Sequence, residues 1–285
     1  MRLNIYHRTT YSYDAPVQYG LQQIRLTPKA RAGQRIIDWS IEIEGGEKEL
    51  TFDDEHNNAV DLVRIDPGAT RLSIICRGEV ETPQNDGILG GHGGYAPLWL
   101  FRRQTDLTRV GDGVRAILAE VQDDAAGIAR LHKLSATIRD RVTYETGTTG
   151  VETTAEDAIA SKQGVCQDHA HIFLAAAREL GHPARYVSGY LKIDDVVDQD
   201  ATHAWAEAYV DGIGWIGFDV SNVISPDERY VRVATGLDYR GAAPISGMRF
   251  GSAEETLHVD LQVQAQGQQQ HQSQQQGAAS APSRE

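Results

Sequence analysis

The most informative stretch of the sequence is Gly164-Val165-Cys166-Gln167-Asp168-His169-Ala170-His171. A turn-prone glycine precedes a cysteine, and an apolar run of helical character follows over residues 172–180. The run ends at Gly181 and Pro183, which are helix-stop signals. In the first turn of a helix, unpaired backbone N–H groups and the positive end of the helix dipole favour the nucleophilic thiolate. The same N–H groups can hold a developing oxyanion, so this position suits a reactive cysteine.

Taken alone, Cys166 would be expected to be a buried structural cysteine, because free cysteines are among the most buried residues. Two later stretches favour chemistry instead. Residues 203–210 alternate as a half-buried strand does, and residues 214–219 show a second short strand pattern after a glycine-containing turn. Such a hairpin can bring His203 close to Asp219. The chain then offers a nucleophile, a base and a carboxylate that orients the base.

The composition indicates a globular chain with an acidic surface. Lys and Arg number 27 and Asp and Glu number 40 among 285 residues, which gives a net charge of −13. This balance argues against nucleic acid as the main partner, because phosphate backbones need a basic face. No run approaches the ~20 apolar residues that cross a bilayer, and the N-terminus lacks an apolar signal region. We therefore expect no membrane partner and a cytoplasmic location.

The chain has two cysteines, too few for a disulfide framework in a protein of this length. Cys166 opens the predicted helix, whereas Cys76 lies in a strand-like run and is expected to be a core residue. A reducing compartment suits a free catalytic thiol.

Residues 1–83 are predicted to form a β-rich, sandwich-like N-terminal domain, because short alternating runs are separated by turn clusters. The expected strands are 3–7, 37–44, 59–65 and 71–80. Residues 84–104 are predicted to be a glycine-rich connector. Its cluster Gly90-Gly91-His92-Gly93-Gly94 lacks the preceding strand, the following helix and the Lys-Ser/Thr pair of a phosphate loop. We interpret it as a flexible linker at the rim of a cleft.

Residues 105–262 are predicted to hold a helical segment and the catalytic core. Apolar residues recur at helical spacing and indicate core packing; they are Ile128, Leu131, Leu134, Ile138 and Val142. Thr154 and Asp157 are spaced as a capping box at the start of a short helix. The acidic segment 194–200 is either a solvated loop or an element that disfavours acidic substrates at the mouth of a cleft. Residues 263–285, rich in glutamine, are predicted to be a disordered tail.

Four stretches, occurring in one order, resemble the bacterial transglutaminase-like family with its papain-like core. They are residues 164–171, 184–190, 203–207 and 214–219. The resemblance implies an α+β fold, in which a sandwich-like N-terminal domain precedes a cysteine helix packed on an antiparallel sheet. It also implies a Cys166–His203–Asp219 triad and acyl transfer through a thioester, with no metal or organic cofactor. One departure is Val220, which stands where the family pattern has a turn-stiffening proline.

Three aromatic residues are further candidates. An aromatic or amide side chain assists the oxyanion site in this superfamily, and the resemblance points to Tyr144, with plain packing as its alternative. Trp205 and Trp215 are predicted either to shape the substrate groove or to lie in the core.

The predicted function is thiol acyl transfer on a protein or peptide substrate. Water as acceptor makes a peptidase or amidase, which we favour, and an amine makes a protein crosslinker. A non-catalytic binding module is another alternative, and the glutamine-rich tail is either an inert linker or an acyl donor. A zinc site is a fourth hypothesis; it would use Cys166, His169, His171 and His203, although their spacing on a helix is poor for a metal. We expect Asp168 and His171 to fix the helix start. The oligomeric state is not predicted.

Overall fold

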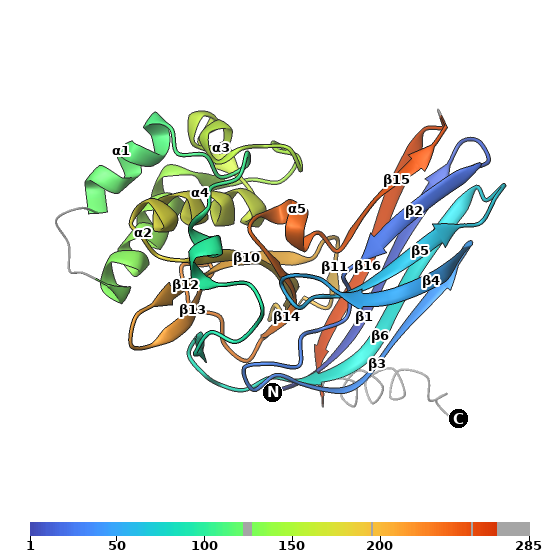
Figure 1. Ribbon diagram of the computed structural model, residues 1–285, viewed down its shortest axis with the longest axis horizontal. Coiled ribbons are helices and arrows are strands. Elements are labelled where there is room, and N and C mark those ends of the chain that lie inside the picture. The colour runs from blue at the N-terminus through green and yellow to red at the C-terminus, as the bar shows by residue number, and fades with distance from the viewer. Residues whose placement is uncertain (122–126, 195, 252, 267–285) are drawn as a thin grey trace, which may run out of the picture.

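A computed structural model describes residues 1–121, 127–194, 196–251 and 253–266. Figure 1 shows two parts: a β-sandwich, and a second sheet covered on one side by helices. The α+β class and the sandwich followed by a helix-on-sheet core are as predicted. No helix in these ranges combines the length and the apolar character needed to cross a membrane.

Two antiparallel sheets form the sandwich. The first has the order β11-β16-β1-β6-β3 and the second the order β15-β2-β5-β4. Their strands are β1 (Arg2–Tyr13), β2 (Tyr19–Ile24), β3 (Arg35–Glu44), β4 (Gly46–Asp53), β5 (Ala59–Ile65), β6 (Arg71–Glu81), β11 (Asp198–Gln199), β15 (Ile245–Phe250) and β16 (Glu255–Ala265). Cys76 lies fully buried on β6 between the sheets, as expected, and burial raises the pKa of its thiol to about 12.

The predicted boundaries need one correction. Strands β15 and β16 lie in the segment assigned to the catalytic core, yet β16 pairs with β1 over its length and β15 pairs with β2. The sandwich is therefore closed by the C-terminal part of the chain (Figure 1). A strand's alternation shows that one face is buried but not which sheet it joins. Strand β16 also continues to Ala265, two residues beyond the predicted start of the tail at 263; residues 267–285 lie outside the described ranges.

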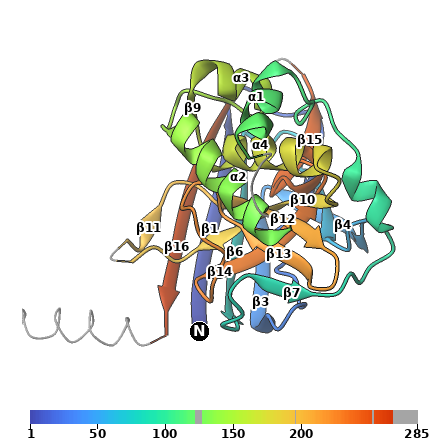
Figure 2. The same cartoon turned by 90° about the vertical axis from the view of Figure 1, so that its left-hand side faces the viewer.

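The core sheet has the order β14-β10-β12-β13-β7. Its strands are β7 (Ile88–Gly90), β10 (Ala184–Leu191), β12 (His203–Val210), β13 (Gly214–Phe218) and β14 (Tyr230–Gly236). The helices around it are η1 (Leu98–Arg102), α1 (Asp112–Val121), α2 (Ile128–Arg141), α3 (Ala155–Ser161), α4 (Cys166–Glu179) and α5 (Tyr239–Ala242). Figure 2 shows α1, α2 and α4 gathered over this sheet.

The cysteine helix α4 sits directly on the sheet because the facing side chains are small. Ala204, Ala206 and Ala208 of β12 alternate toward the apolar core that α4 enters with its own buried run. The predicted stop is confirmed, since Gly181 adopts a left-handed φ of 90° just after the helix. The predicted stripe on α2 and the capping box before α3 are also present.

Candidate active site

Cys166 is the first residue of α4, as the sequence predicts. The carboxylate of Asp168 fixes the turn that leads into it, because its Oδ2 atom accepts from the Val165 amide at 2.8 Å and from the Thr149 hydroxyl at 2.7 Å. Gly164 is required here: a Cβ at that position would lie 2.8 Å from the Cβ of Asp168. The entry to the helix is therefore tightly held, and Cys166 itself stays partly exposed.

The predicted hairpin of β12 and β13 brings His203 and Asp219 together. Ala206 pairs with Phe218, so the residue after β13 falls beside the start of β12. His203 Nε2 lies 2.7 Å from Asp219 Oδ2, and the imidazole lines the same cavity as the Cys166 side chain. Since Nε2 is engaged by the carboxylate, Nδ1 is the nitrogen left for the sulfur.

The electrostatics of His203 favour its charged form. Burial would lower its pKa, but the hydrogen bond to Asp219 and the interactions with Cys166 and Asp219 raise the pKa to about 10. The imidazole is therefore protonated at neutral pH. A cation held next to a cysteine sulfur is the setting that stabilises a thiolate.

Asp219 is fully buried, and two residues that the sequence analysis missed hold it. The Tyr230 hydroxyl donates to Oδ2 at 2.6 Å, and Asn222 donates from its side chain to Oδ2 at 2.7 Å. Burial would raise the pKa of this carboxyl, but the hydrogen bond and charge of His203 outweigh it and lower the pKa. Asn222, three residues after an aspartate, could have been suggested as a turn partner; Tyr230 comes from another strand and left no local signal.

The turn after Asp219 also accounts for the missing proline. The backbones of Asp219 and Ile224 exchange two hydrogen bonds, of 2.9 and 3.2 Å, and Val220 is buried in the core. Val223 closes the turn with a φ of 56°, an unfavourable region for a β-branched residue. Asp219 thus keeps its place without a proline.

Cys166 and His203 open into a cavity of about 520 Å³. Its lining is Tyr144, Thr146, Val165, Gln167, Tyr186, Ser188, Leu191, Ile193, Val196, Asp198, Gln199, Asp200, Ala201, Thr202, Ala204, Tyr239 and Pro244. A second cavity, of about 670 Å³, shares Tyr144, Leu191, Ile193 and His203 with the first. The acidic segment is therefore part of the cleft through Asp198 and Asp200, while Asp195 lies outside the described residues.

Tyr144 lies in both cavities and is 41% exposed. A short parallel ladder of β8 (Thr143–Tyr144) with β9 (Gln163–Gly164) places it beside the residues that lead into Cys166. Burial and the nearby negative charges of Cys166 and Asp219 raise the pKa of its hydroxyl, so it remains a hydrogen-bond donor.

The two tryptophans do not line the groove, which decides between the two predicted roles in favour of core packing. Trp205 and Trp215 are each 1% exposed and are absent from the lining of both cavities around His203. Trp205 stacks behind His203, with ring centroids 6.2 Å apart, and Trp215 packs on Phe101. Both faces of this sheet are covered, so alternation alone could not indicate exposure.

The zinc hypothesis finds no support in the geometry. His169 uses both ring nitrogens, toward Ser221 Oγ at 2.8 Å and the Val142 carbonyl at 2.9 Å. His171 is buried and its Nε2 accepts from the Tyr239 amide. Within the described residues, no group of three or more His, Cys, Asp or Glu side chains is arranged to hold a metal ion.

Comparison with known families agrees with this architecture. Residues 114–220 match the transglutaminase-like superfamily, and residues 3–81 match the bacterial transglutaminase-like N-terminal region. The chain belongs to the transglutaminase-like superfamily. The N-terminal match covers six strands of the sandwich, and the other covers the segment from α1 to just beyond Asp219.

Relatives and a crystal structure extend over nearly the whole chain. An uncharacterized protein of Mycobacterium leprae is 28% identical over 92% of this chain and 98% of its own length. One from Mycobacterium tuberculosis is 27% identical over 92% of this chain and 91% of its own. The crystal structure of a candidate cysteine protease from Cytophaga hutchinsonii superimposes with a TM-score of 0.74 at 23% identity, covering 93% of this chain and 91% of that one. The last comparison shows that the two proteins share a fold.

Proposed function

We propose that this transglutaminase-like protein is a cysteine acyl-transfer enzyme that hydrolyses an amide bond of a peptide or protein. The observation that carries the proposal is the pairing of His203 with Asp219, 2.7 Å between Nε2 and Oδ2, in the cavity that Cys166 also lines. That cavity, of about 520 Å³, is large enough for side chains of a polypeptide.

The first half-reaction forms a thioester. The Cys166 sulfur attacks the carbonyl carbon, and the developing oxyanion is held by N–H groups at the start of α4 and by the Tyr144 hydroxyl. The C–N bond breaks as the His203 imidazolium gives its proton to the leaving amine. Asp219 holds the imidazole in place and stabilises its cation.

The second half-reaction hydrolyses the thioester and regenerates the free enzyme. His203, now neutral, accepts a proton from water, the resulting hydroxide attacks the thioester carbon, and the C–S bond breaks to restore the Cys166 thiolate. The open setting of the site supports water as the acceptor. Cys166 is partly exposed and His203 borders two cavities, whereas transfer to an amine requires that water be kept out.

Transfer to a primary amine is the second candidate, and one observation favours it. Asp198 and Asp200 line the Cys166 cavity and would attract an ammonium group such as that of a lysine side chain. Their attraction would raise the local concentration of an amine acceptor without excluding water.

The deciding experiment follows both outcomes in one reaction. Purified protein is incubated with a glutamine-containing casein, with and without a labelled primary amine, while fragments, ammonia and protein-bound label are measured. Fragments, or ammonia without label, indicate hydrolysis, and label incorporated into casein indicates the amine transferase.

Cys166→Ala is the blank, because it removes the nucleophile from a partly exposed position. A thiol reagent applied to the folded protein serves as a second control, since the other cysteine, Cys76, is buried. Turnover that persists in Cys166→Ala would overturn the proposed mechanism.

A further inference from the structure

A separate polar cavity, distinct from the two around His203, lies where loops of the sandwich and the connector meet the core sheet. Its volume is about 220 Å³, and it shares no lining residue with either cavity around His203. Its lining includes four basic residues, Lys29, Arg31, Arg185 and Arg232, together with Gly91 and Gly93. The glycine cluster of the connector, singled out in the sequence, thus borders this cavity instead.

Three cations lie in or beside this cavity with little exposure. Lys29 and Arg232 are each 8% exposed, and the Arg185 side chain is 13% exposed. Arg185 lies flat over Trp215, with its guanidinium carbon 3.9 Å from the ring centroid. Burial, followed by the charges of Arg232 and Arg185, lowers the pKa of Lys29 to about 7.

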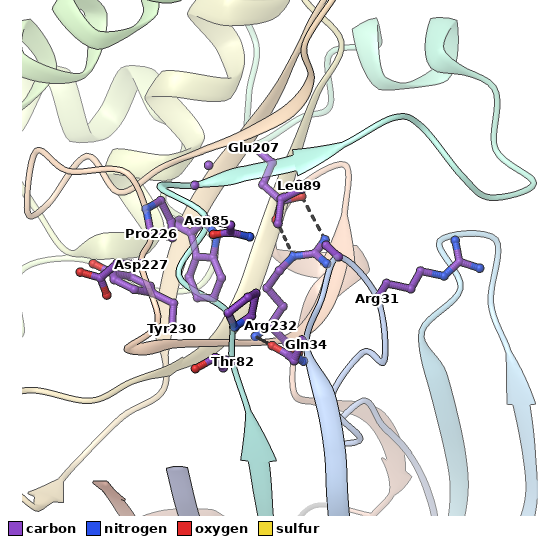
Figure 3. A pocket seen from close by; sticks show the side chains of 15 residues that line it. Arg31, Gln34, Thr82, Asn85, Leu89, Glu207, Pro226, Asp227, Tyr230 and Arg232 are labelled. Atoms are coloured by element: carbon purple, nitrogen blue, oxygen red, sulfur yellow. Dashed lines mark hydrogen bonds and ion pairs between the residues drawn. The ribbon is translucent and has the colours of Figure 1, made fainter. Parts of the chain in front are cut away.

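One fully buried carboxylate, Glu207, balances part of this charge. Its Oε2 accepts from Arg185 Nε at 2.6 Å, and its Oε1 accepts from Arg232 Nε at 2.5 Å. Figure 3 shows Glu207 and Arg232 joined in this way in the small adjoining cavity. Four basic residues, Arg31 included, border the cavity against this one carboxylate, so positive charge is in excess there in a chain whose overall net charge is −13.

The cluster also holds donors without acceptors. Among the described residues, no acceptor contacts the two Nη atoms of Arg185 or Nη1 of Arg232. Lys29 gives two hydrogen bonds, to the carbonyls of His56 and Asn57, which leaves a third N–H. His56 also lines the cavity, and its buried Nδ1 atom has no hydrogen-bond partner among the described residues.

We propose that this cavity binds a phosphate group, as inorganic phosphate or as the end of a small phosphate ester. A phosphate carries close to two negative charges at neutral pH, and it would offset the excess positive charge at this cavity. Guanidinium groups suit its oxygens geometrically, and glycines at 91 and 93 let the connector backbone approach closely. The ligand would join the sandwich, the connector and the core sheet at one point.

Isothermal titration of the full chain in chloride buffer tests the proposal, with inorganic phosphate and glycerol phosphate as the two probes. We expect saturable binding of one phosphate per chain, and a rise in melting temperature that matched ionic strength of chloride does not produce. Tighter binding of glycerol phosphate would identify an ester as the ligand, and equal or tighter binding of inorganic phosphate would identify the free ion.

Arg31→Gln and Arg109→Gln form a matched pair. Arg31 is exposed at the rim, where it donates to the Gly93 carbonyl at 2.7 Å, so its loss should leave the fold intact. We expect Arg31→Gln to weaken phosphate binding at least about tenfold, since one charge-assisted hydrogen bond is lost. Arg109 is 77% exposed and does not line the cavity, so Arg109→Gln should bind phosphate within about twofold of the wild-type affinity. Absence of saturable binding to the wild-type chain, or equal binding by the two variants, would overturn the proposal.

Discussion

Two polar clusters are built on the same strand, β12, and they differ in how their charges are used. His203 begins the strand and Glu207 follows four residues later on the same face, with Trp205 between them. At His203, one buried carboxylate orients a cation that borders an open cavity. At Glu207, one buried carboxylate is shared by two guanidinium groups at the junction with the sandwich.

Comparing the two clusters shows which property distinguishes a catalytic pair from an ion-pair cluster that stabilises the fold. Both carboxylates, Asp219 and Glu207, are fully buried and have a lowered pKa. Only the cation paired with Asp219 reaches a cysteine, while the cations around Glu207 are fixed by an aromatic ring and by backbone carbonyls. The neighbour that the cation faces, a cysteine sulfur at His203 and no nucleophile at Glu207, distinguishes the two more than burial of the anion does.

The largest expected effect is the loss of turnover in Asp219→Asn. An amide cannot stabilise the imidazolium and can select the wrong tautomer of His203, so kcat/KM should fall by about 10⁴-fold. Asp227→Asn is the control, because that aspartate lies close in sequence but is paired with Arg229 at a partly exposed position. Steady-state kinetics and the melting temperature are measured for both. Comparable kcat/KM in the two variants would contradict the role given to Asp219.

Glu207→Gln should instead reduce stability. Removing one partner of a buried pair leaves uncompensated charge, here on Arg185 and Arg232, at a penalty of about 3–5 kcal/mol in the free energy of unfolding. Glu81→Gln is the control, since Glu81 pairs with Arg35 at an exposed site, where solvent screens the pair, and its loss should leave stability close to that of wild type. Urea unfolding measures both variants. Equal losses would mean that the cluster does not hold the junction together.

The contrast also explains what the sequence could reveal. The site around Cys166 could be predicted from a helix start, a hairpin pattern and the family resemblance of four short stretches. Arg185 and Glu207 stand in two of those stretches, yet their pairing depends on the register of β10 with β12, where they lie opposite each other. Arg232 and Lys29 reach the cluster from β14 and from a sandwich loop, and no local pattern encodes such distant meetings.

The fold was predictable to a similar extent. Helices and strands with clear periodicity, such as α2 and β3, were anticipated. Strands β2 and β4 were not, because β4 is mostly exposed and β2 reads as a short polar run. Strands β15 and β16 join the sandwich through pairing with β2 and β1, which are distant in sequence. Their own residues give no signal of these partners, so their placement could not be predicted.

The two clusters should respond to pH with opposite sign. The pKa of His203 rises on folding from 6.5 to about 10, so its contribution to stability is complete below pH 6.5 and is lost as the pH approaches 10. The pKa of Lys29 falls from 10.5 to about 7, so its unfavourable contribution disappears as the pH rises through that range. In His203→Gln only the second effect remains, and the free energy of unfolding should rise more steeply with pH between 7 and 10 than in wild type. Urea unfolding at several pH values gives the slopes, and a variant slope equal to or below that of wild type would refute the assignment.

Tyr230→Phe should have a moderate effect. The ring packs on Trp205, with centroids 5.4 Å apart, and this contact is kept, while the hydrogen bond to Asp219 Oδ2 is lost. Hydrogen bonds to charged groups contribute about 1.5–3 kcal/mol, so kcat should fall at least tenfold with little change in KM. Steady-state kinetics separates the two parameters. A change in KM alone would assign Tyr230 to substrate binding.

The smallest effect concerns the turn that replaces the missing proline. Val223 is held at a φ of 56° and is 45% exposed, so Asn, which tolerates this region, loses little buried surface and relieves strain. Val223→Asn should stabilise the fold by about 0.5–1 kcal/mol, measured as a rise of roughly 2 °C in melting temperature. Val151→Asn, at an exposed valine that lacks a positive φ, should give no gain. If Val223→Asn is more stable and equally active, the turn merely tolerates its strain. If it is more stable but has a lower kcat, the strained turn itself orients Asp219 toward His203. Backbone strain would then contribute to catalysis as well as to the fold.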